Sequence, residues 1–208
     1  MNLFAILVRL AIAAAAADRA PFDIPVSDKC PASRPDASFF PAELVAADER
    51  DPIWPTWYAR FLRAAGETPL WCGPGAQHES YRFMWIPPTV RMRAPGVRTM
   101  VVRVSHAASG DKLVATVLPP PGPNKIAATT VSRVLEPAQW QALTGKLTAP
   151  GFWRGARPEH WAMDGAECLF EGRRAGRYHI IMRNASDLRQ CQAMGLAFLA
   201  AAGLALPP

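Results

Sequence analysis

The chain has 208 residues, of which 50% are hydrophobic, and it carries a formal net charge of +6. This length fits one domain, or one domain with a small appendage. A chain of this size can bury about 70% of its surface, so disulfides are optional for its stability. The 21 prolines and 14 glycines argue against a helical bundle and favour a loop-rich protein.

Residues 1–17 are predicted to form a signal peptide. Residues 3–17 are apolar except for Arg9 and end in three alanines before Asp18, which is the pattern of an apolar segment followed by a cleavage site. An uncleaved membrane span is the alternative, although such a span needs about 20 apolar residues. We therefore expect an exported protein, periplasmic or secreted, with no stable membrane span after cleavage.

Residues 18–51 form a proline-rich lead-in that we expect to be extended, with helical spacing only over residues 42–48. Residues 52–65 predict the clearest helix, because large apolar side chains recur there at intervals of three and four. These side chains are Trp54, Trp57, Tyr58, Phe61, Leu62 and Ala65. Such a stripe is usually part of a core, and membrane binding is a minor alternative.

Four segments between residues 81 and 135 have the composition of strands and are separated by loops that contain proline or glycine. They are residues 81–86, 97–104, 113–118 and 126–135, and residues 109–111 form the turn between the second and the third. A short helix begins at Glu136 and Pro137, and a closing apolar helix begins at Ser186 or Asp187.

Two further segments alternate between two faces and predict a β-hairpin, residues 166–172 and 177–184. Gly176 in the basic tip can supply the positive φ that a short hairpin loop requires. The loop places Glu171 opposite Tyr178 or His179, depending on the turn type.

Together these elements predict a single α+β domain over residues 52–206. It contains an antiparallel sheet of about six strands, with two or three helices packed on one face.

Glu171, His179 and Tyr178 are the candidate catalytic residues. A carboxylate that holds an imidazole fixes its tautomer and raises its basicity. The competing structural interpretation gives Glu171 hydrogen bonds from the turn and from Arg177, and makes His179 a cross-strand partner. That interpretation is favoured, because no nucleophile motif accompanies the pair.

The other histidines give weaker signals. His106 lies close in sequence to Ser109 and Asp111, which are the residue types of a catalytic triad, yet the spacing is that of a hairpin turn. The four histidines are scattered along the chain. We therefore expect no metal site, and the motifs of cofactor-binding loops are missing from the sequence.

The four cysteines are Cys30, Cys72, Cys168 and Cys191. None belongs to a C-x-x-C motif, so one or two disulfides are expected in an oxidising compartment. A bridge between Cys30 and Cys72 would close a loop of about 40 residues and stabilise the fold by about 4 kcal/mol. Cys168 and Cys191 pair if the last helix packs on that strand, and otherwise are buried thiols.

The basic residues fall into two groups, around residues 82–103 and 173–177, and export argues against a nucleic-acid partner. An unknown protein or an anionic component of the cell envelope is the expected partner class, although for these basic residues themselves a solvated face that binds nothing is favoured over either. The candidate binding residues are Glu79, Arg82, Arg98, Arg103, Arg177 and Arg183.

Several short segments between residues 57 and 204 carry a resemblance. They include Glu79-Ser80-Tyr81-Arg82-Phe83-Met84-Trp85, Glu136-Pro137-Ala138-Gln139-Trp140, Glu171-Gly172, and Gly176-Arg177-Tyr178-His179 with Arg183. On these motifs the chain resembles an uncharacterised family of bacterial exported proteins. The chain departs from the family pattern at Cys168 and Asn184, where the family tends to carry aromatic residues. The resemblance implies a fold and a candidate surface but no reaction.

The sequence favours an exported, non-enzymatic binding or interaction protein, whose surface includes the sheet face of Glu171 and His179 and the strand pair around residues 91–103. A hydrolase-like enzyme that uses Glu171 and His179 as an acid/base pair is the first alternative. The second is an envelope structural protein tethered by an uncleaved segment 3–17.

Overall fold

The computed structural model describes residues 24–30, 39–46, 54–73, 78–88, 91–92, 94, 96–120, 127–148, 152–154, 165–183 and 188–205. The side chains of residues 46, 154, 183 and 188–193 are outside this description. The predicted signal peptide and most of the predicted lead-in lie outside the described residues.

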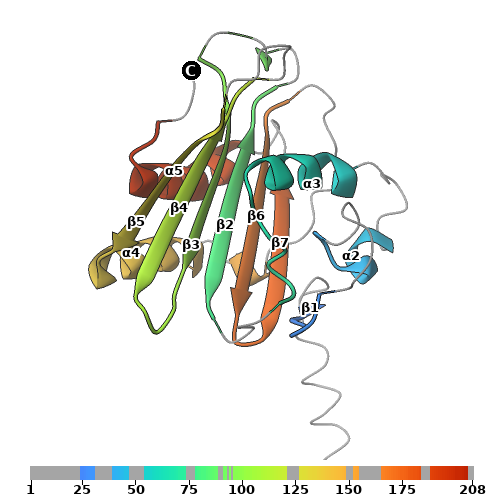
Figure 1. Cartoon of the computed structure of the whole chain (residues 1–208), viewed down its shortest axis with the longest axis vertical. Coiled ribbons are helices and arrows are strands. Elements are labelled where there is room, and N and C mark those ends of the chain that lie inside the picture. The colour runs from blue at the N-terminus through green and yellow to red at the C-terminus, as the bar shows by residue number, and fades with distance from the viewer. Residues whose placement is uncertain are drawn as a thin grey trace, which may run out of the picture.

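A seven-stranded antiparallel sheet forms the middle of the molecule, with the strand order β1-β7-β6-β2-β3-β4-β5 (Figure 1). Its strands are β1 (Ile24–Pro25), β2 (Ser80–Ile86), β3 (Thr99–Ser105), β4 (Asp111–Leu118), β5 (Thr129–Leu135), β6 (Glu167–Arg174) and β7 (Arg177–Arg183). The predicted α+β class is confirmed, and each of the six predicted strands is present. The seventh, β1, is a two-residue strand inside the lead-in.

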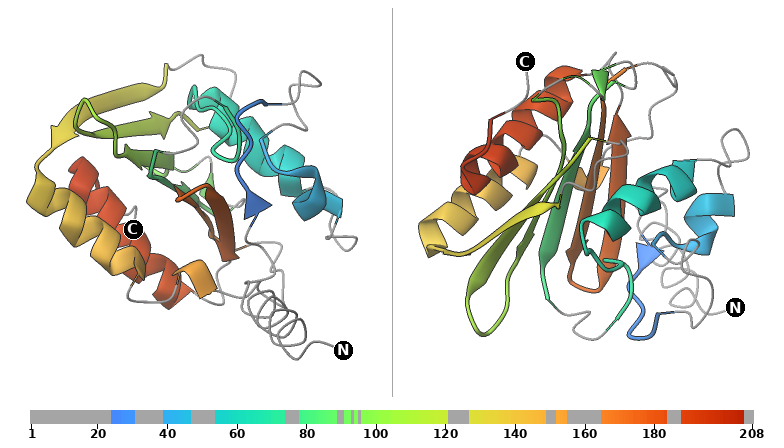
Figure 2. Two further views of the ribbon diagram at one scale, coloured as in Figure 1. Left: turned by 90° about the horizontal axis from the view of Figure 1, so that it is seen from below. Right: turned by 45° about the horizontal axis from the view of Figure 1, so that its top comes forward.

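Helices cover both faces of the sheet rather than the one face expected, as the two views of Figure 2 show. The reason lies in the central strands. All seven residues of β2 are buried, and alternate side chains enter two different apolar clusters. Tyr81 and Phe83 join one cluster, and Met84 joins the other. A strand that is apolar on both faces must be covered on both.

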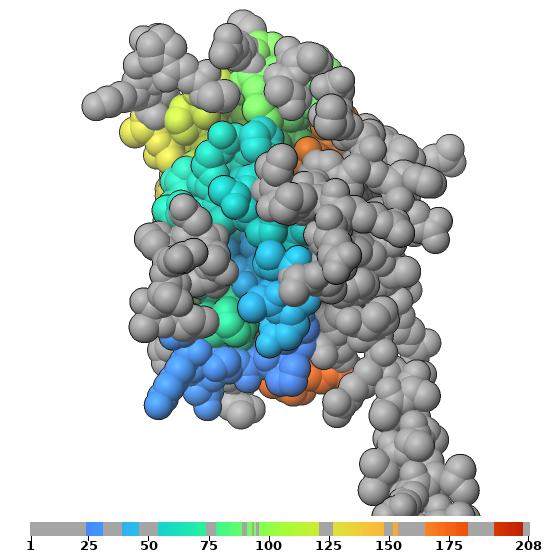
Figure 3. Space-filling model, turned by 90° about the vertical axis from the view of Figure 1, so that its right-hand side faces the viewer, coloured from blue at the N-terminus to red at the C-terminus, as the bar shows by residue number. Residues whose placement is uncertain are grey.

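The first face is covered by α3 (Trp54–Ala64) and the short helix α2 (Ala42–Ala46). The predicted aromatic stripe of α3 is part of the core, with Trp54, Tyr58 and Leu62 buried in a cluster that also contains Met84 and Leu169. Figure 3 shows α2, α3 and the segment around β1 on this side of the molecule.

The second face is covered by α4 (Pro137–Thr148), the short 3-10 helix η2 (Phe152–Arg154) and α5 (Leu188–Ala202). Phe198 of α5 packs near Phe83 and Phe170 of the sheet, with ring centroids 5.8 and 6.2 Å away. The close approach depends on Gly195, because a Cβ at this position would lie 2.5 Å from Cζ of Phe83.

The predicted β-hairpin is confirmed, and its turn fixes the pairing of its strands. Ala175 and Gly176 both have positive φ, at 49° and 72°, which is the conformation of a two-residue type I′ turn. In the resulting register Glu171 is opposite Ile180 and Gly172 is opposite His179. Neither of the two expected partners of Glu171 is therefore its direct cross-strand neighbour.

A disulfide joins Cys30 to Cys72, which is one of the candidate pairs. Beside it, Ser27 forms a bridge with Cys72, and the amide of Val26 donates to the carbonyl of Gly176. The lead-in is thus held against the hairpin tip. Cys168 is also disulfide-bonded, and the other half of that bond falls outside the described side chains. No helix among the described residues is long and apolar enough to cross a membrane.

Candidate functional site

Arg82 and Glu171 form a buried ion pair on the α3 side of the sheet. Arg82 Nε donates to Glu171 Oε2 over 2.6 Å, and both side chains are fully buried. Arg82 Nη2 lies equally close to the same oxygen but outside hydrogen-bond geometry. Arg82 Nη1 donates to Glu67 Oε2 at 3.1 Å and to the carbonyl oxygen of Thr68 at 2.8 Å.

Tyr178 and Arg103 complete this cluster from two sides. The Tyr178 hydroxyl donates to Glu171 Oε1 at 2.8 Å, so the predicted proximity of Glu171 and Tyr178 is correct although they are not direct strand partners. Arg103 Nε donates to Glu67 Oε2 at 2.9 Å, and Arg103 is the cluster's contact with solvent, with 30% of its side chain exposed.

Burial and pairing have opposite effects on the pKa values in this cluster. Burial alone would lower the pKa of Arg82. The carboxylates of Glu171 and Glu67 raise this pKa by more than burial lowers it, so the guanidinium stays charged. Burial raises the pKa of Glu171 by more than Arg82 and Tyr178 lower it. Burial and the adjacent Glu171 raise the pKa of Tyr178 well above its ordinary value. Apart from Arg103 the cluster is buried and its charges are paired, which suits a structural role.

His179 lies on the opposite face of the sheet from Glu171. Its ring is fully buried beside Phe152 and Trp153, with centroids 5.1 and 5.9 Å away. The alternation of side chains along β6 and β7 produces this separation, because the register places His179 opposite Gly172 rather than Glu171. The predicted acid/base pair of Glu171 and His179 is therefore wrong. The prediction that both residues belong to one binding surface is wrong for the same reason.

The candidate binding residues do not form one surface. Arg82 is buried in the cluster, and Glu79 accepts a hydrogen bond from the Tyr81 hydroxyl at 2.6 Å. Arg98 donates to the carbonyl oxygen of the preceding Val97. Arg177 is exposed near the hairpin turn, while the side chain of Arg183 is outside the description.

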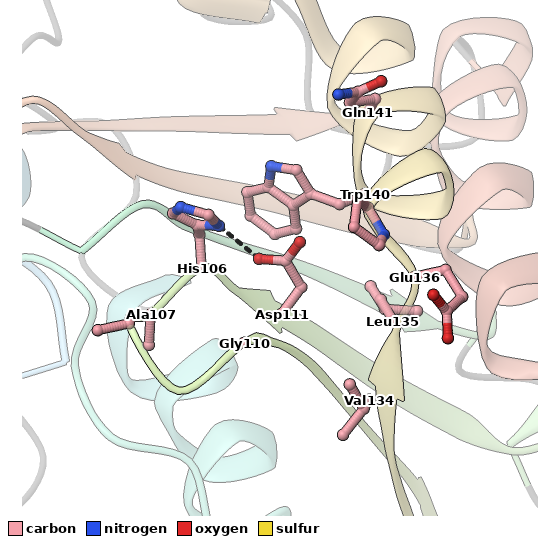
Figure 4. A pocket seen from close by; sticks show the side chains of 11 residues that line it. His106, Ala107, Gly110, Asp111, Val134, Leu135, Glu136, Trp140 and Gln141 are labelled. Carbon is pink, nitrogen blue, oxygen red and sulfur yellow. Dashed lines mark hydrogen bonds and ion pairs between the residues drawn. The ribbon is translucent and has the colours of Figure 1, made fainter.

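A pocket of about 460 Å³ lies on the β4–β5 side of the sheet, between the β3–β4 loop and the junction of β5 with α4. His106 forms one wall of the pocket, and 59% of its side chain is exposed. Its Nδ1 is hydrogen-bonded to Asp111 Oδ1, and the centroid of its ring lies 5.5 Å from that of Trp140. Figure 4 shows the three side chains together, with the bond drawn as a dashed line.

The opposite wall of the pocket is formed by Val134 and Leu135 of β5 and by Glu136 and Pro137 at the start of α4. The sequence pattern predicts that His106 and Asp111 belong to one turn but gives them no role. The signal was present, because a tight β3–β4 hairpin brings His106 opposite Asp111 across its loop. The contribution of Trp140 comes from a helix, and no local pattern predicts that contact.

The strand β5 continues this surface along the edge of the sheet. Six of its seven residues are exposed, and only Leu135 is buried. Val131 is 46% exposed and Val134 is 74% exposed, which makes them two of the three large apolar side chains exposed among the described residues.

Comparison of the chain with protein-family models and with curated protein sequences finds no match. The fold and its sites define an α+β protein that has a largely buried ionic cluster on the α3 side of the sheet and an open pocket beside an exposed edge strand. The resemblance to an exported family stays a prediction.

Proposed function

We propose that this chain is an exported, non-enzymatic binding protein, and that its partner binds at β5 and the adjoining pocket. The leader pattern of residues 1–17 supports export. The disulfide between Cys30 and Cys72 supports it independently, because such bonds persist in oxidising compartments.

The observation that carries the binding proposal is the exposure of β5 beside the pocket. Edge strands present unpaired backbone groups, and proteins usually cover or shorten them. Here a seven-residue edge strand exposes two valines. The pocket at its end adds apolar lining from Trp140 and Leu135 and polar lining from His106 and Asp111. Concave apolar sites with a few placed polar groups are typical of binding.

Site-specific photo-crosslinking tests this proposal in the producing cell. A photoreactive phenylalanine analogue replaces Val134, and in a matched control it replaces Leu196, an apolar side chain on α5 that is 49% exposed. The expected result is a discrete adduct from position 134 and none from position 196. Equal labelling from both positions, or no adduct from position 134, would contradict the proposal.

N-terminal sequencing of the mature chain tests export. A chain that begins at Asp18 and is recovered outside the cytoplasm is the expected result. A chain that retains residues 1–17 and sediments with membranes supports the tethered alternative instead.

A further inference from the structure

Among the described residues, the edge of β5 has few of the features that prevent another strand from adding to it, and Arg133 is its one charged side chain. The strand is outermost in the sheet order, and its ladder with β4 runs without interruption from the pair Asp111 and Leu135 to the pair Val117 and Thr129. Thus no β-bulge twists the edge away. The strand also contains neither proline nor lysine, the residues that commonly protect edges.

The exposed valines lie on opposite faces of β5, since their positions differ by an odd number. Val131 is on the face of Leu135, which belongs to the cluster under α4 and α5. Val134 is on the other face, where Thr130 contacts Thr116. A helix laid on one face would cover one valine. A strand placed alongside β5 brings side chains next to both.

Each face also presents a cation beside its valine. Arg133 follows Val131 by two residues on one face, and Lys112 is the cross-strand partner of Val134 on the other. Both are exposed, and neither has an ion-pair partner among the described residues. Glu136 lies beyond the end of the strand, at the start of α4, and is not part of the ladder. The edge therefore complements acidic side chains.

A second copy of this chain fits the edge less well than an acidic partner does. Pairing β5 with itself would bring a second Arg133 and a second Lys112 to the same edge, and like charges at neighbouring strand positions are unfavourable. The net charge of +6 opposes self-association at longer range as well.

We infer that β5 binds an extended, acidic segment of a partner protein as an eighth strand of the sheet. This inference rests on the proposed function and specifies the chemistry of the partner. Backbone hydrogen bonds to the free edge supply affinity, and apolar and acidic side chains on both faces of the segment supply specificity.

Two labelled peptides test the inference by fluorescence anisotropy. The first is Thr-Val-Glu-Glu-Val-Thr-Val, capped at both ends, which carries one glutamate on each face; the second has lysine in place of both glutamates. The acidic peptide is expected to bind several-fold more tightly, because its charge next to Arg133 on β5 changes from repulsive to attractive, and Lys112, one strand further away on β4, adds a weaker long-range attraction. Hydrogen exchange should slow in β5 when the acidic peptide is bound.

A charge-reversed double variant, Lys112→Glu with Arg133→Glu, should prefer the lysine peptide. Both substitutions are at exposed positions, so the fold should be retained. Lys29→Glu is the matched control, since Lys29 is exposed near the opposite edge of the sheet, and it should leave the preference unchanged.

Three results would overturn the inference: no saturable binding of either peptide, binding without slower exchange in β5, or an unchanged preference in the double variant. A wild-type dimer that Val134→Lys dissociates would assign the edge to a second copy and overturn it too. If position 134 still crosslinks in cells while the peptides fail, the proposed function stands and only the partner's chemistry is wrong.

Discussion

Arg82 on β2 and Glu171 on β6 are direct cross-strand partners, and the 2.6 Å bond between them is buried on the α3 side of the sheet. Desolvation makes a buried ion pair a poor source of net stability. Its second effect is on register, because a slip of one residue would turn either charged group onto the apolar face that contains Phe83 and Phe170. The pair therefore specifies how β2 and β6 align.

Glu171→Gln should destabilise the protein by about 3–5 kcal/mol, since it leaves a buried guanidinium with one carboxylate partner instead of two. The measurement is urea unfolding at neutral pH. Glu43→Gln on α2 is the control with the same change of charge at an exposed position, and it should alter the free energy of unfolding by less than about 0.5 kcal/mol. Equal effects of the two substitutions would show that the pair is not important for stability.

The stability of the fold should decline at alkaline pH. The pKa values of Tyr178 and Tyr81 are both raised by burial and by a neighbouring glutamate. An unfolded tyrosine releases its proton near pH 10, so above that pH the native state binds more protons than the unfolded state. The contribution of these two tyrosines to the free energy of unfolding is therefore fully present below about pH 10 and is lost as the pH rises above it.

Tyrosine absorbance near 295 nm, recorded with unfolding curves between about pH 8 and 12, checks this decline around the ordinary tyrosine pKa. The phenols of Tyr81 and Tyr178 should ionise only as the protein unfolds. Tyr178→Phe should be less stable at neutral pH, because it loses the bond to Glu171, but its stability should fall less steeply at high pH. Reversible ionisation of all three tyrosines in the folded protein would contradict this account.

Local patterns were enough to predict the strands and the main helices, because each depends on the period of its own side chains. The stripe from Trp54 to Leu62 and the alternation in β6 and β7 are signals of this kind. The same patterns do not predict that helices cover both faces of the sheet. Residues such as Phe83 and Met84 are equally apolar on both faces of β2, and a strand's sequence does not show which helix will cover which face.

The candidate site was harder to predict for a related reason. A hairpin turn longer or shorter by one residue would place Glu171 and His179 on the same face of the sheet. The two-residue turn instead places Ile180 opposite Glu171. The true partner of Glu171, Arg82, is 89 residues away in sequence. Such contacts are set by the strand order, which places β2 beside β6.

Ala175→Asn should stabilise the protein by about 0.5–1 kcal/mol. Ala175 has a φ of 49°, a conformation that costs an alanine energy, whereas asparagine followed by glycine is the preferred pair in a type I′ turn. Thermal or urea unfolding measures the change. Ala108→Asn, in the β3–β4 turn but without positive φ, is the control and should have little effect. A destabilised Ala175→Asn variant would contradict the assignment of the turn.

Two glycine-to-alanine substitutions in helices should have opposite effects. Alanine is the better helix former by about 1 kcal/mol, so Gly145→Ala in α4, where a Cβ would meet nothing within 4 Å, should stabilise the protein by about that amount. Gly195→Ala in α5 gains the same propensity, but its Cβ would lie 2.5 Å from Phe83, whose ring is packed beside Phe170 and Phe198. Overpacking of this kind costs about 1–3 kcal/mol, so Gly195→Ala should be net destabilising.

Urea unfolding of the two variants beside the wild type measures this difference. Adding Phe83→Leu to Gly195→Ala removes the ring that the new methyl group would contact. The double variant should then lose less stability than the sum of the two single changes, because the clash is shared between them. Additive effects, or a Gly195→Ala variant as stable as Gly145→Ala, would show that α5 does not pack against β2 through Gly195.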